Sequence, residues 1–419
     1  MSDPVSVTEA ALLARDQESQ PWQQAFVAML SGPLTREQLI DRVTERIGYA
    51  PRFRRLVTGW PLPTWVDDVG FSVGGHVREA TLAPGERLES WLSAKLQSGL
   101  DRAHSPWEAT LVHGIAPGTT ALVVRTHAAL VDGYDNVHLL QELFDEYAED
   151  ITDVDDAWRP SAAEGFGIGD LLSSLNDPLQ ALKSAATGLV GMVENAVRTA
   201  SATARPQHLA GVEVDLDALA GVRERFGCTT HDVILALATA GVRGWLVEHN
   251  RELVDQVALV PLAVAEPAVL ESAIGCRVAP SWVALPIGVA DAADRLRTLA
   301  TLTRARIDTG VSVPARDLID LAGFAPPTLH SVAAGTVAAG RPHSVMVANV
   351  PGPATKRYLG RARLSRVYAV SATTDAQDVS VSIVSYAGRV SFGAAAVEPL
   401  SRWAADIDAE LTALREESR

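Results

Sequence analysis

His127, Asp132 and Gly133 are the residues of this chain whose types and spacing could do chemistry. They follow the run from Thr119 to Thr126, which is rich in β-branched residues and predicts a strand. A neutral imidazole at the end of a strand can take a proton from a hydroxyl group near pH 7. Attack by a hydroxyl oxygen on a carbonyl carbon needs that proton to leave, and positioned donors stabilise the oxyanion that forms.

The segments that must position these residues alternate between helix and strand patterns. Apolar residues at helical spacing predict helices over Thr35–Ile47 and Glu86–Leu100, and a further helix over Val137–Tyr147 beyond the glycine. An alternating pattern predicts a strand at Val212–Leu216. Helices and strands mixed without a strict βαβ rhythm indicate an α/β sandwich.

The length of 419 residues is sufficient for two domains, each with its own core. Residues 149–163 are acidic and irregular and predict a linker, and residues 168–204 read as a helix that crosses between two domains. A lid, or a helix that touches a membrane, is the alternative for the second segment. We therefore expect a first domain at 1–150, a linker with a crossover helix at 151–208, and a second domain at 209–419.

Composition and charge exclude several classes of protein. The net charge of −15 argues against binding to nucleic acid and allows at most peripheral contact with a membrane. No apolar run approaches 18 residues, and the N-terminus has no basic region or apolar signal core, so we expect a cytoplasmic protein. Cys228 and Cys276 form neither a disulfide framework nor a metal-ligand spacing. Abundant Ala and Val, with arginine favoured over lysine, hint at a GC-rich bacterial genome, and nothing indicates an oligomeric state.

Short motifs occur in a fixed order along the chain, from about residue 6 to about residue 400. They are Pro51–Leu56, Pro63–Asp67, His76–Arg78, Leu100–Glu108, Ala348–Pro353 and Ser385–Arg389. In this order the motifs resemble those of the bacterial wax ester synthase / acyl-CoA:diacylglycerol acyltransferase family. The resemblance implies two chloramphenicol-acetyltransferase-like α/β sandwich domains with mixed β-sheets and a tunnel between them. It also implies that a fatty acyl thioester enters one side of the tunnel and an alcohol the other, without a metal or redox cofactor.

The family's catalytic element is His-His-x-x-x-Asp-Gly, in which the second histidine is the general base. In this chain that position is Ala128. His127 cannot simply take over, because successive side chains of a strand point to opposite faces, although a local bulge could redirect it. We expect His127 to be a packed or hydrogen-bonded histidine behind the strand. General-base catalysis is typically worth about 10²–10⁴-fold, or roughly 3–5 kcal/mol of barrier, so its loss predicts slower catalysis.

Other polar groups of the family are also replaced. They include the Asn before Asp232, which is His231, and a Gly-Asn-Arg that reads Gly275-Cys276-Arg277. The resemblance gives His127, Asp132, Gly133 and His231 as catalytic candidates, and it places Trp107, Ala128, Asp232, Cys276, Arg277, Asn349 and Ser385 along the tunnel.

Four residues could replace the missing base or supply a nucleophile, and each has a plainer interpretation. His231 could act from the start of a helix, or it could serve in the core or as a cap. His104 and His138 could line the tunnel, or they could belong to a loop and to a packed helix. Cys276 could be a nucleophile if Arg277 stabilised its thiolate, or it could be a small buried thiol.

Three functions stay open at this point. The first is an enzyme that transfers an acyl group from acyl-CoA or a carrier-bound thioester to a small alcohol or amine, with weakened catalysis. The second is a catalytically silent homologue that binds an acyl chain or a partner protein. The third is an enzyme of specialised metabolism that uses the same tunnel for another reaction.

Overall fold

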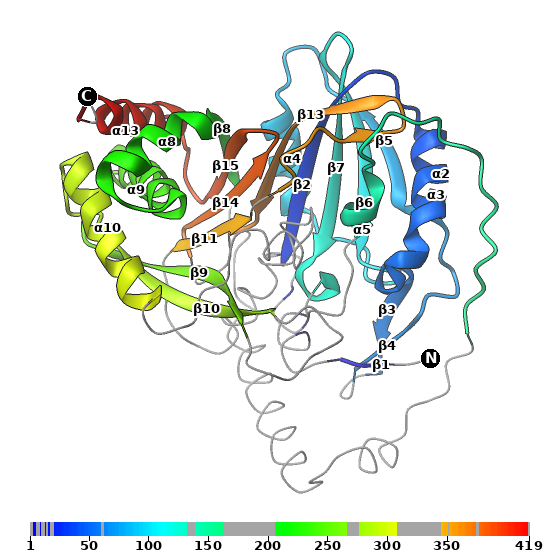
Figure 1. Ribbon diagram of the computed structural model, residues 1–419. Helices are drawn as coiled ribbons and strands as arrows, with labels where there is room; N and C mark the ends of the chain where they lie inside the picture. The colour runs from blue at the N-terminus through cyan, green and yellow to red at the C-terminus, as the bar shows by residue number, and fades with distance from the viewer. Residues whose placement is uncertain are drawn as a thin grey trace, which may run out of the picture.

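A computed structural model describes most of the chain (Figure 1). The described residues are 3–5, 9, 13, 16, 21–59, 63–131, 139–161, 206–265, 276–307, 345–350, 352–373 and 377–417. Within these ranges only the backbone is described at 3–4, 131, 141, 259–265, 276–282, 305–307, 346 and 348–350.

The first of two six-stranded sheets is built around β7, the strand that carries His127. Across the sheet its strands are β12 (Tyr358–Leu359), β13 (Ala362–Ser371), β2 (Gln23–Ser31), β7 (Thr119–His127), β6 (Trp107–Ala116) and β5 (Val77–Thr81). All neighbours are antiparallel except β5 and β6, which run parallel. The strand predicted from Thr119 to Thr126 is confirmed as β7.

Helices and short elements surround this sheet. The predicted helices at 35–47 and 86–100 are confirmed as α2 (Arg36–Arg46) and α4 (Leu88–Gln97). Thr35 caps α2 in a capping box with Gln38. The smaller elements are η1 (Ile47–Tyr49), η2 (Pro51–Arg54), α3 (Val73–His76) and a three-stranded sheet of β1 (Asp3–Pro4), β4 (Thr64–Asp67) and β3 (Arg55–Thr58).

The helix predicted over Val137–Tyr147 is shorter than expected. In the described residues it is α5 (Leu139–Leu143). The prediction that the helix continues to Tyr147 is wrong, because Asp145 pairs with Tyr358 instead, through two backbone hydrogen bonds of 2.8 and 2.9 Å. A bridge to a strand more than 200 residues later overrides the local helical pattern.

The two faces of the first sheet pack against different cores. Val124 and Phe26 face a core that includes Leu39 of α2. Val123, the next residue along β7, faces a second core that includes Leu92 of α4. Alternation along β7 therefore decides which side of the sheet each of its side chains joins.

The second sheet lies beside the first (Figure 1). Across it the strands are β10 (Cys276–Leu285), β9 (Gln256–Ala265), β11 (Val345–Val350), β14 (Val379–Tyr386), β15 (Arg389–Ala396) and β8 (His208–Asp215). β11 runs parallel to β9 and β14, and the other neighbours are antiparallel. The strand predicted at 212–216 lies within β8, apart from Leu216. With both sheets mixed, the predicted α/β fold is confirmed.

Four helices cover the outer side of the second sheet, at the left of Figure 1. They are α8 (Leu216–Phe226), α9 (Thr230–Glu248), α10 (Ala292–Ile307) and α13 (Trp403–Glu417). The core between helices and sheet contains Leu237 of α9, Trp403 of α13 and Val381 of β14.

The two sheets are joined by an exchange of strands. β12 and β13 come from the C-terminal part of the chain, yet they pair in the first sheet beside β2. Residues 358–371 thus belong to the first sheet, although they lie within the predicted second domain at 209–419. The domain boundaries at 150 and 209 stay predictions. β13 also packs on β14 and β15 of the second sheet. At this crossing a Cβ atom on Gly393 would lie 2.1 Å from the carbonyl oxygen of Ala369, so the two backbones meet where glycine has no side chain.

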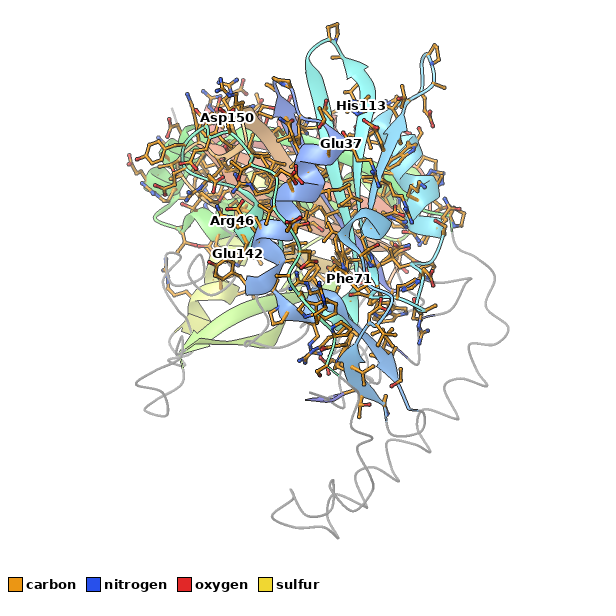
Figure 2. All side chains as sticks on the ribbon, turned by 90° about the vertical axis from the view of Figure 1, so that its right-hand side faces the viewer. Glu37, Arg46, Phe71, His113, Glu142 and Asp150 are labelled. Atoms are coloured by element: carbon orange, nitrogen blue, oxygen red, sulfur yellow. The ribbon has the colours of Figure 1, made fainter. Side chains whose placement is uncertain are left out.

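The segment 149–161 has no helix or strand and lies against the outer side of the first sheet. Arg54 donates to Asp156 over 3.0 Å, and its guanidinium lies 5.0 Å from the ring of Trp158. Figure 2 looks onto this side, with Arg46 on α2 and Phe71 below it. The predicted crossover helix at 168–204 lies outside the described residues. In the part of the chain that is described, no helix is long and apolar enough to span a bilayer.

Candidate active site

The candidate site begins where β7 ends. The strand stops at His127, and the short helix η3 (Ala128–Val131) follows. The N–H of His127 donates to the carbonyl of Pro106 over 3.0 Å, and the N–H of Ala128 donates to the carbonyl of Trp22 over 2.9 Å. The backbone of the turn is thus held from both sides, while Asp132 and Gly133 lie outside the described residues.

Both ring nitrogens of His127 face a partner. The residue is only 1% exposed, and its Nδ1 accepts a hydrogen bond of 3.0 Å from the N–H of Ala129. A neutral imidazole that accepts at Nδ1 carries its proton on Nε2. Nε2 lies 3.5 Å from Oδ2 of Asp16, which is an ion-pair distance but longer than a hydrogen bond. In this arrangement no lone pair of the ring is free to take a proton from a substrate.

His127 and Ala128 lie on different sides of the strand. Arg125 lies two residues before His127 in β7, so the two side chains project from the same face of the strand. The Arg125 side chain donates to the carbonyl of Lys95 in α4 over 2.7 Å. Ala128 instead joins the core that contains Leu39 of α2. The imidazole therefore does not occupy the space to which a side chain at position 128 points.

Asp16 is a member of the site that no motif of the sequence indicates. Its Oδ1 accepts a hydrogen bond of 2.7 Å from the N–H of Trp22, and Arg102 lies 3.5 Å from Oδ2. Burial alone would raise the pKa of the Asp16 carboxyl, but His127, the Trp22 N–H and Arg102 together hold that pKa below its usual value. A single aspartate in a polar N-terminal segment carries no pattern that could have revealed this role.

Trp107 pairs with Thr126 across the sheet and is 2% exposed. Its indole N–H donates to the carbonyl of Phe53 over 2.8 Å, and its ring stacks on His76 with 4.6 Å between centroids. These contacts give Trp107 a packing role in the core, and its predicted place along the tunnel stays a prediction.

His104 forms a second Asp–His pair, on the outer side of the first sheet. Its Nδ1 lies 3.0 Å from Oδ2 of Asp68, a carboxylate that is itself 2% exposed. His104 also meets His76 edge to face, and His76 stacks on Phe71, which Figure 2 shows on the outer side next to α2. The imidazole is well oriented, but it lies with this aromatic cluster and not between the sheets.

His231 and Asp232 lie in the first turn of α9, in the other half of the molecule. Asp232 closes a capping box: it accepts from the N–H and the hydroxyl of Thr229, both at 2.8 Å, and from the hydroxyl of Thr303. Its carboxylate is therefore committed to the helix. His231 is partly buried, and this burial lowers its pKa while Asp232 opposes the change, so the imidazole is neutral near pH 7.

The remaining candidates lie in the second sheet. Cys276 and Arg277 begin β10 opposite Ala265 and Val264, and Asn349 lies in β11 opposite Ile383, but their side chains are outside the description. The hydroxyl of Ser385 in β14 accepts from the N–H of Gly352 over 3.1 Å and so links residue 352 to this strand. His138 lies outside the described residues.

Comparison with known proteins decides the family. Residues 2–234 match the wax ester synthase/diacylglycerol acyltransferase catalytic domain, and residues 274–414 match the C-terminal domain of the same family. The chain belongs to the wax ester synthase/diacylglycerol acyltransferase family. It is similar to the probable diacylglycerol O-acyltransferase tgs2 of Mycobacterium tuberculosis, with 26% identity over 395 residues that cover 87% of this chain and 86% of the relative.

Solved structures agree on the fold. A wax ester synthase/diacylglycerol acyltransferase from Marinobacter aquaeolei VT8 superposes with a TM-score of 0.68 at 20% identity, covering 99% of both chains. A starter condensation domain of rhizomide synthetase superposes with a TM-score of 0.52 at 13% identity, covering 100% of this chain and 95% of that one. The expected chloramphenicol-acetyltransferase-like two-domain fold is therefore confirmed, whereas the tunnel between the domains stays a prediction.

Proposed function

We propose that this protein transfers an acyl group from acyl-CoA or a carrier-bound thioester to an alcohol or amine, and that the transfer is slow because the motif lacks its base. Membership of the family supports the reaction class. The hydrogen bond from the Ala129 N–H to Nδ1 of His127 carries the second part of the proposal. It occupies the lone pair that a base would need.

The missing base affects the two kinds of acceptor differently. An alcohol must lose its proton as it attacks the thioester carbonyl, and without an imidazole this proton passes to water or to a weaker base. The reaction of an amine that is already partly deprotonated is slowed less by the absence of a base. What remains for both acceptors is proximity and stabilisation of the oxyanion. Asp132 and Gly133 complete the sequence motif.

A catalytically silent homologue that binds an acyl chain or a partner is the second candidate. The same observation favours it, since a turn without a free imidazole need not catalyse anything. Thiol release above background that is abolished in His231→Gln would favour a working enzyme over the silent homologue.

Restoring the missing imidazole tests the proposal. In Ala128→His we expect the release of thiol from a long-chain acyl-CoA, in the presence of an alcohol, to rise about 10²-fold or more, because the new side chain projects where His127 does not. The control is Ala128→Asn, which adds a polar side chain without a base. Thiol release no faster than the uncatalysed background in Ala128→His, Ala128→Asn and the natural chain, all folded by circular dichroism, would contradict the proposed acyl transfer and support the silent homologue. Equal rates above that background would contradict the role given to the missing base.

A further inference from the structure

We infer that Asp16 is a positioning residue of the motif turn, and that it holds the backbone at residues 127–129 through His127 and Trp22. The inference rests on the proposed function only for its consequence on rate. Two series of contacts lead from the Asp16 carboxylate to the turn, one through Trp22 and one through His127.

Two routes lead from Asp16 to consecutive backbone amides. By the first, Oδ1 of Asp16 accepts from the N–H of Trp22 over 2.7 Å, and the carbonyl of Trp22 accepts from the N–H of Ala128 over 2.9 Å. By the second, Oδ2 of Asp16 lies 3.5 Å from Nε2 of His127, and Nδ1 of that ring accepts from the N–H of Ala129 over 3.0 Å. The carboxylate thus fixes residue 128 from both of its sides.

In the second route, the negative charge of Asp16 decides which ring nitrogen of His127 carries the proton. The side chain of Asp16 is 11% exposed and that of His127 is 2% exposed, so water screens the pair poorly. A carboxylate beside Nε2 favours the proton on that nitrogen, which leaves Nδ1 as the acceptor that Ala129 needs. Arg102, 3.5 Å from the same oxygen, balances the buried negative charge.

The same arrangement distinguishes this pair from an Asp–His pair that prepares a base. In a catalytic pair the far nitrogen of the ring faces the substrate, as the outer nitrogen of an exposed His104 could. At His127 the far nitrogen faces a backbone N–H instead. The pair therefore sets the geometry of the turn and acts on the reaction only through the residue at position 128.

Nuclear magnetic resonance of ring nitrogens tests the inference without any activity. In protein labelled with ¹⁵N-histidine, with the His127 signals assigned from their loss in His127→Gln, we expect the Nε2–H tautomer in the natural chain. In Asp16→Asn we expect a measurable population of the other tautomer, whereas Asp408→Asn, a change on the exposed side of α13, should leave the spectrum unchanged. An Nδ1–H tautomer in the natural chain would overturn the inference, as would an unaltered tautomer in Asp16→Asn.

Kinetics in the Ala128→His background test the consequence. Asp16→Asn should lower kcat there by about tenfold or more with little change in KM, because a turn displaced by a fraction of an ångström misplaces the new imidazole. In Ala128→His/His127→Asn, where the link from the ring to Asp16 is already broken, the same change should cost less than about twofold if the effect passes through His127. Equal losses in the two backgrounds would overturn the route through the ring. If Ala128→His itself shows no gain, the proposed function fails, while the tautomer measurement still decides the role of Asp16.

Discussion

The ring of His127 illustrates how the partners of an imidazole decide its role. Asp16 and Asp68 each orient a histidine, but they do so in opposite ways. Asp16 faces Nε2 and leaves Nδ1 to a backbone amide, in a site that is almost fully buried. Asp68 faces Nδ1 of His104, a side chain that is 47% exposed. The Asp16–His127 arrangement holds the backbone after β7, whereas of these two pairs only Asp68–His104 leaves a ring nitrogen on the solvent side.

The sequence could predict part of this. The alternation of side chains along β7 gives opposite sides to residues 127 and 128, and the structure places His127 and Ala128 accordingly. The partner of the ring was not predictable, because Asp16 contacts it through tertiary folding and the segment around it has no periodic pattern. The same limit applies to Asp68 and His104.

The contribution of the Asp16 charge to the free energy of unfolding should depend on pH. Its folded pKa lies below the unfolded value of about 3.9, so the ionised carboxylate stabilises the protein above that pH, and this contribution is lost as the pH falls through the folded pKa. We expect Asp16→Asn to reduce the free energy of unfolding at pH 7 by more than it does near pH 3, as measured by urea denaturation at both values. Asp408→Asn supplies the baseline for an exposed carboxylate. A reduction by Asp16→Asn that is the same at both pH values would show that the charge does not stabilise the fold.

At the scale of elements, the strand exchange brings two sheets into contact at one crossing. Local patterns predicted α2 and α4 from the helical spacing of their apolar residues, and β7 from its run of β-branched residues. They could not predict that β13 pairs with β2, because a strand's pattern states which residues are buried but not which strand lies next to it. The early end of α5 has the same origin, in the distant partner of Asp145.

Gly393→Ala should test the crossing. The added Cβ would lie 2.1 Å from the carbonyl oxygen of Ala369, so β15 and β13 must move apart, and we expect a loss of about 1–3 kcal/mol in the free energy of unfolding. The matched control is Gly221→Ala in α8, where a Cβ meets no atom within 4 Å and the change should be neutral or stabilise the helix by up to about 1 kcal/mol. Chemical denaturation measures both. If the two variants unfolded alike, the close approach at Gly393 would not contribute to stability.

At the scale of the whole molecule, side-chain hydrogen bonds at β13 and at β8 also join the two sheets and their helices. The hydroxyl of Tyr386 in β14 donates to the carbonyl of Leu364 in β13 over 3.1 Å and accepts from the N–H of Arg357 over 2.8 Å. Gln207, next to β8, accepts from the hydroxyl of Ser93 in α4 and donates to Thr373 over 2.9 Å. The first sheet therefore depends on residues from both ends of the chain, and so does the placement of the motif turn at the end of β7.

This dependence predicts how separate halves behave. A chain of residues 1–205 lacks β12 and β13, so β2 becomes an exposed edge strand and one side of its core loses Val367 and Leu364. We expect that chain alone to show no cooperative unfolding by circular dichroism. Produced together with residues 206–419, it should form a complex that unfolds in a single transition, because the missing strands return to their place beside β2. Cooperative unfolding of 1–205 by itself, with a midpoint close to that of the intact protein, would show that the first sheet does not need the exchanged strands.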